Sequence, residues 1–394
     1  MFAPILWAIW LILASLSNAS GLSQTPRCIM YLTGQHPIIP TEKALVNNIT
    51  HVILAFMNSD VFNADETPRG FPLFTTVSQV RSQVQPGTKV MVAIGGWGDS
   101  KGFEQAAKND TARKHWARQV SSMVNMTGAD GVDIDWEYPG GNRDDYKKIP
   151  NSEREWEIGA FVLLLRELRA ALGDHLISIA VPGLRRDMMA FTAATLGQII
   201  EEVDFINVMT YDLMNRRDTV VKHHSGVNGS HDAVQEYINH GAPPAMLNLG
   251  LGYYVKAFMT QDCDPEHPLG CPTQLLEDPK TGADLGKAAG FSWHDKVPAG
   301  LGPSFARSQQ NGRYFDDGSF GFWDAEEKRW WSYDTPAVIK IKVLRIVGRM
   351  DLGGVFAWGL GEDAPRFEHL RATVDAVQIL NHTGAFDHGI KDEL

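Results

Sequence analysis

Residues 130–137 read Asp130-Gly131-Val132-Asp133-Ile134-Asp135-Trp136-Glu137, and this stretch is the most informative part of the chain. From residue 132 onward, apolar and acidic side chains alternate with the two-residue period of a β-strand, so Asp133, Asp135 and Glu137 share one face. Neighbouring carboxylates repel one another, and burying them is costly unless they are partnered or protonated. An acid catalyst exploits this crowding, because it raises a carboxyl pKa toward the working pH.

An exposed acidic strand and a calcium loop are the two alternatives for this stretch. An exposed acidic strand usually contains Lys, Ser or Thr, and residues 130–137 contain none of them. A calcium site takes its oxygen ligands from a turning loop instead of a strict alternation. The pattern therefore favours catalysis, with the acid pair of glycoside hydrolysis as the reference chemistry.

Eight apolar runs rich in β-forming residues are spaced along the chain, and stretches of helical period lie between them. The runs are Cys28–Leu32, His51–Phe56, Lys89–Ile94, Gly131–Asp135, Leu176–Val181, Phe205–Met209, Asn248–Gly252 and Gly354–Trp358. The longer helical stretches are Gly102–Met126, Glu153–Leu172, Ala190–Val203 and Pro336–Met350. This alternation predicts buried parallel strands with helices outside, and eight units predict a (β/α)8 TIM barrel with its active site at the carboxyl ends of the strands. A doubly wound sheet is the alternative, but no glycine-rich phosphate turn follows the first strand.

The interval 256–332 breaks this rhythm before the eighth strand. It is too long for a structureless loop in a compact domain, and it contains the aromatic-rich segment Arg313–Trp331, in which Gly318 separates two aromatic runs as in a hairpin. We therefore expect an α+β insertion subdomain between strands seven and eight. Cys263 and Cys271 lie eight residues apart in this interval, a spacing that suits a small disulfide loop, whereas Cys28 lies in an apolar strand and is expected to be a buried free thiol.

The two ends of the chain indicate the secretory pathway. Residues 1–19 are typical of a signal peptide, whose apolar run Leu6–Leu16 is shorter than a bilayer span; an uncleaved anchor is the alternative. The tail, residues 382–394, ends in Lys391-Asp392-Glu393-Leu394, the retrieval signal of the endoplasmic reticulum, so the KDEL receptor is a possible partner and the lumen or the exterior the expected location. Five sequons agree with this route: Asn48, Asn109, Asn125, Asn228 and Asn381. The sequence contains no second apolar stretch long enough to predict a membrane span. The net charge of −11 argues against a nucleic-acid or anionic-membrane partner.

Four motifs in this sequence resemble those of glycoside hydrolase family 18, the chitinase family. The D-x-x-D-x-D-x-E signature is matched by Asp130, Asp133, Asp135 and Glu137; S-x-G-G by Ala93-Ile94-Gly95-Gly96; M-x-Y-D by Met209-Thr210-Tyr211-Asp212; and the tryptophan of the last strand by Trp358. The interval 256–332 resembles the chitinase insertion domain of the deep-cleft branch. The resemblance covers residues 20–381 as one catalytic barrel, with two departures: Ala93 replaces the serine of the second motif, and the loop 213–217 differs from the commoner version.

The resemblance implies substrate-assisted, retaining hydrolysis of β-1,4 bonds in chitin or chitin oligosaccharides, without a cofactor or a metal. It makes Glu137 the general acid and then the base, and it has Asp135 accept a hydrogen bond from the acetamido N–H of the substrate. Asp133 shares a proton with Asp135, and Tyr211 donates a hydrogen bond to the acetamido oxygen. Asp130 is more often structural. Trp358 is expected to form the floor under the sugar. Further expected sugar contacts are Tyr31, Phe56, Gly95, Gly96, Trp97, Tyr138, Met209, Asp212 and Tyr254.

Two other functions stay open on the sequence. An endo-β-N-acetylglucosaminidase acting on N-glycans uses the same chemistry, and a chitin-binding lectin uses the same fold. The insertion favours a chitinase, and Glu137 argues against a lectin because lectin members of the family usually lose this acid. His223-His224 could suggest a metal, but no further His or Cys lies at ligand spacing, so we interpret them as loop residues.

Overall fold

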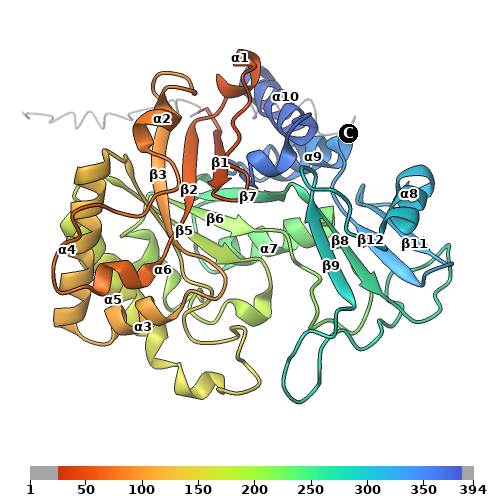
Figure 1. Ribbon diagram of the computed structural model, residues 1–394, viewed down its shortest axis with the longest axis horizontal. Helices are drawn as coiled ribbons and strands as arrows, with labels where there is room; N and C mark the ends of the chain where they lie inside the picture. The colour runs from red at the N-terminus through yellow and green to blue at the C-terminus, as the bar shows by residue number, and fades with distance from the viewer. Residues whose placement is uncertain (1–24, 384–394) are drawn as a thin grey trace, which may run out of the picture.

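The computed structural model describes residues 25–383 and shows a closed barrel of eight parallel strands in the order β1-β13-β7-β6-β5-β4-β3-β2 (Figure 1). The barrel strands are β1 (Arg27–Thr33), β2 (His51–Met57), β3 (Lys89–Gly95), β4 (Gly131–Asp135), β5 (Leu176–Pro182), β6 (Phe205–Met209), β7 (Leu247–Gly252) and β13 (Gly354–Trp358). The predicted TIM barrel is confirmed, and each of the eight expected strands matches an observed one to within one residue at either end. The barrel closes where β1 pairs with β13, which places Tyr31 beside Trp358.

Helices surround the barrel on the outside (Figure 1). They are α1 (Lys43–Val46), α2 (Val77–Arg81), α3 (Lys101–Ala107), α4 (Asp110–Thr127), α5 (Trp156–Leu172), α6 (Leu196–Ile200), α7 (Val227–Asn239), α9 (Pro336–Lys342) and α10 (Glu368–Thr383). The last of the expected helical stretches begins as α9 and continues as the π-helical turn Val343–Val347.

Two of the expected helices are wrong in extent because polar side chains interrupt them. The stretch Gly102–Met126 is two helices, since Asn109 has an extended backbone and its side chain accepts from the Ala112 N–H, which starts α4. In the stretch Ala190–Val203 only α6 is α-helical. The Thr195 hydroxyl donates to the Ala190 carbonyl at 2.7 Å and stabilises a turn in place of the first helical turns.

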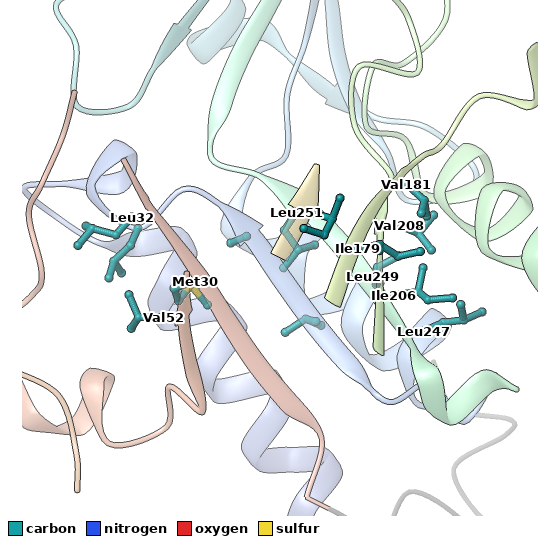
Figure 2. Close-up of a cluster of buried hydrophobic side chains, with 14 of the residues drawn as sticks. Met30, Leu32, Val52, Ile179, Val181, Ile206, Val208, Leu247, Leu249 and Leu251 are labelled. Carbon is teal, nitrogen blue, oxygen red and sulfur yellow. The ribbon is translucent and has the colours of Figure 1, made fainter. Parts of the chain in front are cut away.

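Successive side chains of each barrel strand point alternately outward and inward, so the barrel has one apolar core outside its strands and another inside. Outward-facing side chains pack under the helices, as Figure 2 shows for Met30, Leu32, Val52, Ile179, Val181, Ile206, Val208, Leu247, Leu249 and Leu251. A smaller cluster that includes Ile29, Tyr31 and Phe356 fills the barrel interior. Val132 and Ile134 belong to the outer core, so the acidic residues that alternate with them on β4 point into the barrel.

The predicted insertion between the seventh and eighth barrel strands is an antiparallel five-stranded sheet beside the barrel (Figure 1). Its order is β10-β11-β12-β8-β9, and its elements are β8 (Tyr254–Met259), β9 (Ala288–Ser292), α8 (Gly302–Asn311), β10 (Arg313–Tyr314), β11 (Phe320–Asp324) and β12 (Arg329–Ser332). The hairpin expected around Gly318 joins β10 to β11. Cys263 and Cys271 form the expected disulfide, and Cys28 is buried and free.

The terminal features expected from the sequence, residues 1–19 and Lys391–Leu394, lie outside the described residues. Within residues 25–383, no helix is both long and apolar enough to cross a membrane. Four of the five sequon asparagines are exposed: Asn109, Asn125, Asn228 and Asn381. Asn48 is half-buried, and its amide donates to the Ala44 carbonyl at 2.8 Å.

Candidate active site

The acidic residues of β4 lie at its carboxyl end, inside the mouth of the barrel. Asp133 is fully buried and Asp135 is 3% exposed, while Glu137 follows the strand and is half-buried. Asp130 lies at the opposite end of the strand, where its carboxylate accepts from the Val90 N–H at 2.8 Å and from Arg81 at 2.7 Å. Its expected structural role agrees with these contacts.

Asp133 is held by three donors from three other strands. The Tyr31 hydroxyl donates to Oδ2 at 2.7 Å, the Ser178 hydroxyl donates to Oδ1 at 2.6 Å, and Asn207 Nδ2 lies 3.5 Å from Oδ1. Burial raises the pKa of Asp133 to about 6, and these three hydrogen bonds oppose the rise because they favour the ionised form.

The other two carboxyls of the site are also shifted toward the protonated form. Burial, and then the charges of Glu137 and Asp133, raise the pKa of Asp135 well above its ordinary range, and Oδ1 of Asp135 has no hydrogen-bond partner among the described residues. Burial raises the pKa of Glu137 to about 8; a hydrogen bond with Tyr138 opposes this, and the charges of Asp212 and Asp187 add to it. The cluster therefore holds protons at neutral pH, which is the state that an acid catalyst requires.

Two glycines at the end of β3 allow the backbone to approach the acidic strand closely. The Gly96 N–H donates to the Asp135 carbonyl at 2.8 Å. At Gly95 the φ angle is +112°, and a Cβ atom would lie 2.3 Å from that same carbonyl oxygen. At Gly96 the φ angle is +94°, and a Cβ atom would lie 2.7 Å from the ring of Phe56. Both positions need glycine for its conformation and for its lack of a side chain.

An aromatic floor faces these carboxyls from the other side of the barrel mouth. Trp358 is half-buried and stacks on Phe56, with ring centroids 5.4 Å apart and an interplanar angle of 23°. Tyr31 lies 5.9 Å from Trp358, and Met209 belongs to the same cluster with 8% of its surface exposed. Trp358 is therefore not wholly enclosed in the core, and the floor lies at the top of the barrel interior.

The residues after β6 complete a polar wall. The Tyr211 ring packs edge-on against Tyr254 at 6.0 Å. Asp212 accepts from the Tyr254 hydroxyl at 3.0 Å and pairs with Lys256 at 3.0 Å. Although burial raises it, the pKa of Asp212 is held below its ordinary value, mainly by the charge of Lys256, so this carboxylate stays ionised beside Tyr211.

Beside the barrel mouth, Trp97 is 51% exposed and lies edge-on to Tyr138 at 6.4 Å. Arg217 lies 5.8 Å from the Trp97 ring and 3.9 Å from the Tyr146 ring. The Tyr146 hydroxyl donates to Glu277 of the insertion. These contacts connect the loops after β3, β4 and β6 with the inserted segment on one side of the barrel mouth.

The structure brings together every catalytic and sugar-contact residue expected from the sequence, and it adds several that the sequence did not single out. The additional residues are Ser178, Asn207, Asp187, Arg217 and Lys256. A polar residue within an otherwise apolar barrel strand was the available signal for the first two, because such a side chain must face the barrel interior or lack a partner. Asp187 ends the 3-10 turn Arg185–Asp187, Arg217 lies in the loop after β6, and Lys256 lies on β8 of the inserted sheet. No motif marks these three residues.

The histidine pair lies apart from the carboxyl cluster of β4. Burial lowers the pKa of His223 to about 4 and that of His224 to about 3, so both rings are neutral at physiological pH. In the part of the chain that the structure describes, no group of three or more His, Cys, Asp or Glu side chains is arranged to hold a metal ion.

The sequence of this chain is similar to a known protein family and to several named proteins. The family model for glycosyl hydrolases family 18 matches residues 27–363. Chitinase 1 of Aphanocladium album is 28% identical over 354 residues, which cover 79% of this chain and 75% of that protein. Chitinase 63 of Streptomyces plicatus is 27% identical over 378 residues, which cover 82% of this chain but 55% of that longer protein, so the chain spans about half of it.

Solved structures show the same fold at lower identity. A chitinase from Rhizomucor miehei superposes with a TM-score of 0.69 at 21% identity, over 89% of this chain and 99% of that one. A family 18 N-acetylglucosaminidase from Paenibacillus barengoltzii superposes with a TM-score of 0.65, also at 21% identity and over 89% and 99% of the two chains.

Proposed function

The chain belongs to family 18 of the glycosyl hydrolases, and we propose that it is a chitinase that cleaves β-1,4 bonds between N-acetylglucosamine residues with retention of configuration. The observation that carries the proposal is Glu137, an acid with its pKa raised to about 8, two residues beyond a buried Asp135 and opposite the aromatic floor of Trp358 and Phe56. The relatives named chitinases, from Aphanocladium album and Streptomyces plicatus, support chitin as the substrate.

In the first step, Glu137 gives its proton to the glycosidic oxygen, and the leaving sugar departs with it. The acetamido oxygen of the substrate attacks the anomeric carbon, so the nucleophile belongs to the substrate and the ring formed is an oxazolinium ion. Tyr211 donates a hydrogen bond to the attacking oxygen. In the second step, the Glu137 carboxylate takes a proton from water, and the hydroxide opens the ring at the same face of the sugar.

The aspartate pair balances the positive charge that forms in the first step. Asp135 accepts the acetamido N–H, and its unpartnered Oδ1 leaves it free to do so. Asp133 shares one proton with Asp135, because two carboxylates so close together rarely both ionise. The pair thus carries one proton and one negative charge, and the charge opposes the oxazolinium ion in a dry site where electrostatic stabilisation is strong.

The remaining expected contacts hold the sugar chain. Trp358 supports the distorted sugar from below, with Phe56, Tyr31 and Met209 beside it. Trp97 offers an exposed ring for the next sugar, at the side where Tyr138, Asp212 and Tyr254 line the cleft. We further propose the division into a barrel, residues 20–381, and an inserted subdomain, residues 256–332, that walls this cleft.

The test compares two substrates and three proteins. Wild-type protein, Glu137→Gln and Asp130→Asn are incubated with N-acetylglucosamine hexamer and with a high-mannose glycopeptide. We expect the wild type and Asp130→Asn to cleave the hexamer, because Asp130 is outside the site, and Glu137→Gln to lose the activity. Cleavage of the glycopeptide alone would assign the protein to the endo-β-N-acetylglucosaminidases, binding without cleavage would assign it to the lectins, and activity in Glu137→Gln would refute the mechanism.

For the cellular route, we propose the secretory pathway with retrieval to the endoplasmic reticulum. The disulfide in the insertion and the four exposed sequon asparagines are consistent with an oxidising lumen. Deleting residues 391–394 and following the protein by microscopy and by its glycans tests the proposal. We expect the deletion to increase secretion, and unchanged location would contradict the retrieval role.

A further inference from the structure

One row of residues crosses β3, β4 and β5 at the level of the first buried aspartate. Ala93 pairs with Asp133 on one side, and Ser178 pairs with Asp133 on the other. Residues at one register in neighbouring strands point to the same face, and all three side chains are fully buried in the barrel. The aspartate therefore has a methyl group as one lateral neighbour and a hydroxyl as the other.

The methyl group stands where the related motif S-x-G-G has a serine. A methyl group cannot donate a hydrogen bond, so β3 offers Asp133 no side-chain donor at this level. The Ser178 hydroxyl lies 2.6 Å from Oδ1 and approaches the carboxyl from β5, the strand that pairs with β4 on the side away from β3. Among the described residues, the other contact of Oδ1 is Asn207 at 3.5 Å, the outer limit of a hydrogen bond.

Asn207 is fixed by other partners and cannot replace the serine. Its Nδ2 donates to the Tyr31 hydroxyl at 3.0 Å, and its Oδ1 accepts from Asn248 at 2.8 Å. Asn248 in turn accepts from Arg27 Nε at 2.9 Å. This buried chain of polar groups holds Asn207 back from Asp133, so a loss of the Ser178 hydroxyl would leave Oδ1 without a close donor.

We propose that Ser178 is a positioning residue for the aspartate pair: from β5 it supplies Asp133 with the hydroxyl that Ala93 cannot supply from β3, and it keeps the pair negatively charged when substrate binds. This inference rests on the proposed chitinase function. A carboxylate that loses a close donor in a buried site takes up a proton more readily. Without Ser178 the pair gains a second proton at a higher pH, becomes neutral and no longer balances the charge of the oxazolinium ion.

The test moves the hydroxyl from one side of Asp133 to the other. Ser178→Ala removes the hydroxyl. The double variant Ala93→Ser/Ser178→Ala restores a hydroxyl from β3, and it leaves the row with one alanine and one serine beside Asp133, as in the wild type. For Ser178→Ala we expect the acid limb of kcat/KM against pH to rise by about one pH unit and kcat/KM at pH 5 to fall by about tenfold or more. In the double variant the limb returns toward the wild-type position.

A second readout does not depend on activity. Loss of a hydrogen-bond donor destabilises an ionised carboxylate more than a protonated carboxylic acid. The decrease in Tm caused by Ser178→Ala should therefore be larger at pH 8 than at pH 4. The double variant should reduce this difference. An unchanged acid limb together with a pH-independent loss of Tm would overturn the inference and make Ser178 a packing residue. A wild-type protein that does not cleave the hexamer would refute the proposed function instead, while the Tm comparison would still decide the role of Ser178 toward Asp133.

Discussion

Replacing Gly96 by alanine tests whether the backbone at the end of β3 builds the sugar platform. A Cβ atom at this position would lie 2.7 Å from the Phe56 ring, and that ring stacks on Trp358 at 5.4 Å. Phe56 must therefore move, and Trp358 loses its support. Gly98 is the matched control, because its φ of +91° is close to the +94° of Gly96 but no atom lies within 4 Å of its added Cβ.

The two variants share the backbone cost and differ in the clash. An alanine at positive φ costs about 1–2 kcal/mol at either position. At Gly96 the forced displacement of Phe56 adds about 1–3 kcal/mol, the range for overpacking a well-packed site. At about 2 °C per kcal/mol, Gly96→Ala should melt about 2–6 °C below Gly98→Ala. Loss of the ring contact, worth about 0.5–1.5 kcal/mol, should lower kcat/KM by about two- to tenfold.

Thermal unfolding and hydrolysis of N-acetylglucosamine hexamer, measured side by side, decide the question. Equal melting temperatures and equal kcat/KM for the two variants would refute the packing argument, because the backbone cost alone would then explain both. A fall in kcat/KM in Gly98→Ala as large as that in Gly96→Ala would show that the loop after β3, and not the Phe56–Trp358 contact, controls the site.

Three further outcomes follow from charges and cross-links in the structure. The pKa of Glu137 is raised to about 8 and the acid must be protonated, so kcat/KM should fall about tenfold per pH unit above pH 8; a basic limb near the ordinary glutamate range would contradict this. Replacing Cys263 and Cys271 by serine opens a loop of sequence separation 8 and should cost about 2–3 kcal/mol in unfolding experiments, and an unchanged denaturant midpoint would exclude a stabilising role. Arg143→Met leaves the buried Glu157 without its ion pair and should cost about 3–5 kcal/mol, which Arg143→Met/Glu157→Leu should largely restore if the unpaired charge is the cause.

The barrel could be predicted from the sequence because its strands carry a strong, local signal. Most of the buried parallel strands are nearly continuous apolar runs, so their positions follow from composition, and β4 is marked by its alternation of apolar and acidic residues. Helix ends were harder to predict, since the break at Asn109 depends on one side chain capping a second helix within an unbroken amphipathic stretch. The short α6 likewise depends on a threonine hydroxyl that competes for backbone groups.

Those residues of the site that belong to sequence motifs could be predicted. The carboxyls of β4 were expected to lie on one face, and they do, because a two-residue period fixes the face of each side chain. The partners of these carboxyls were not predictable, since Tyr31 is 102 residues and Ser178 is 45 residues from Asp133 in the sequence. β4 pairs with β3 and β5, whereas Tyr31 comes from β1, which does not pair with β4 and reaches Asp133 only in the folded barrel.

The closing seam between β1 and β13 also has a consequence for how the protein is made. Thr33 and Glu362, whose side chains meet beside this seam, are 329 residues apart, so the seam cannot form until nearly all of the chain has left the ribosome. Tyr31 and Trp358 are partners across it, and within residues 25–383 they come from the first and the last strand to be synthesised. The three carboxyls are synthesised long before Trp358, so the nascent chain lacks the tryptophan platform through most of elongation. Catalytic competence should therefore appear only at the end of synthesis, in a single late step, and such long-range pairing is intrinsically slow.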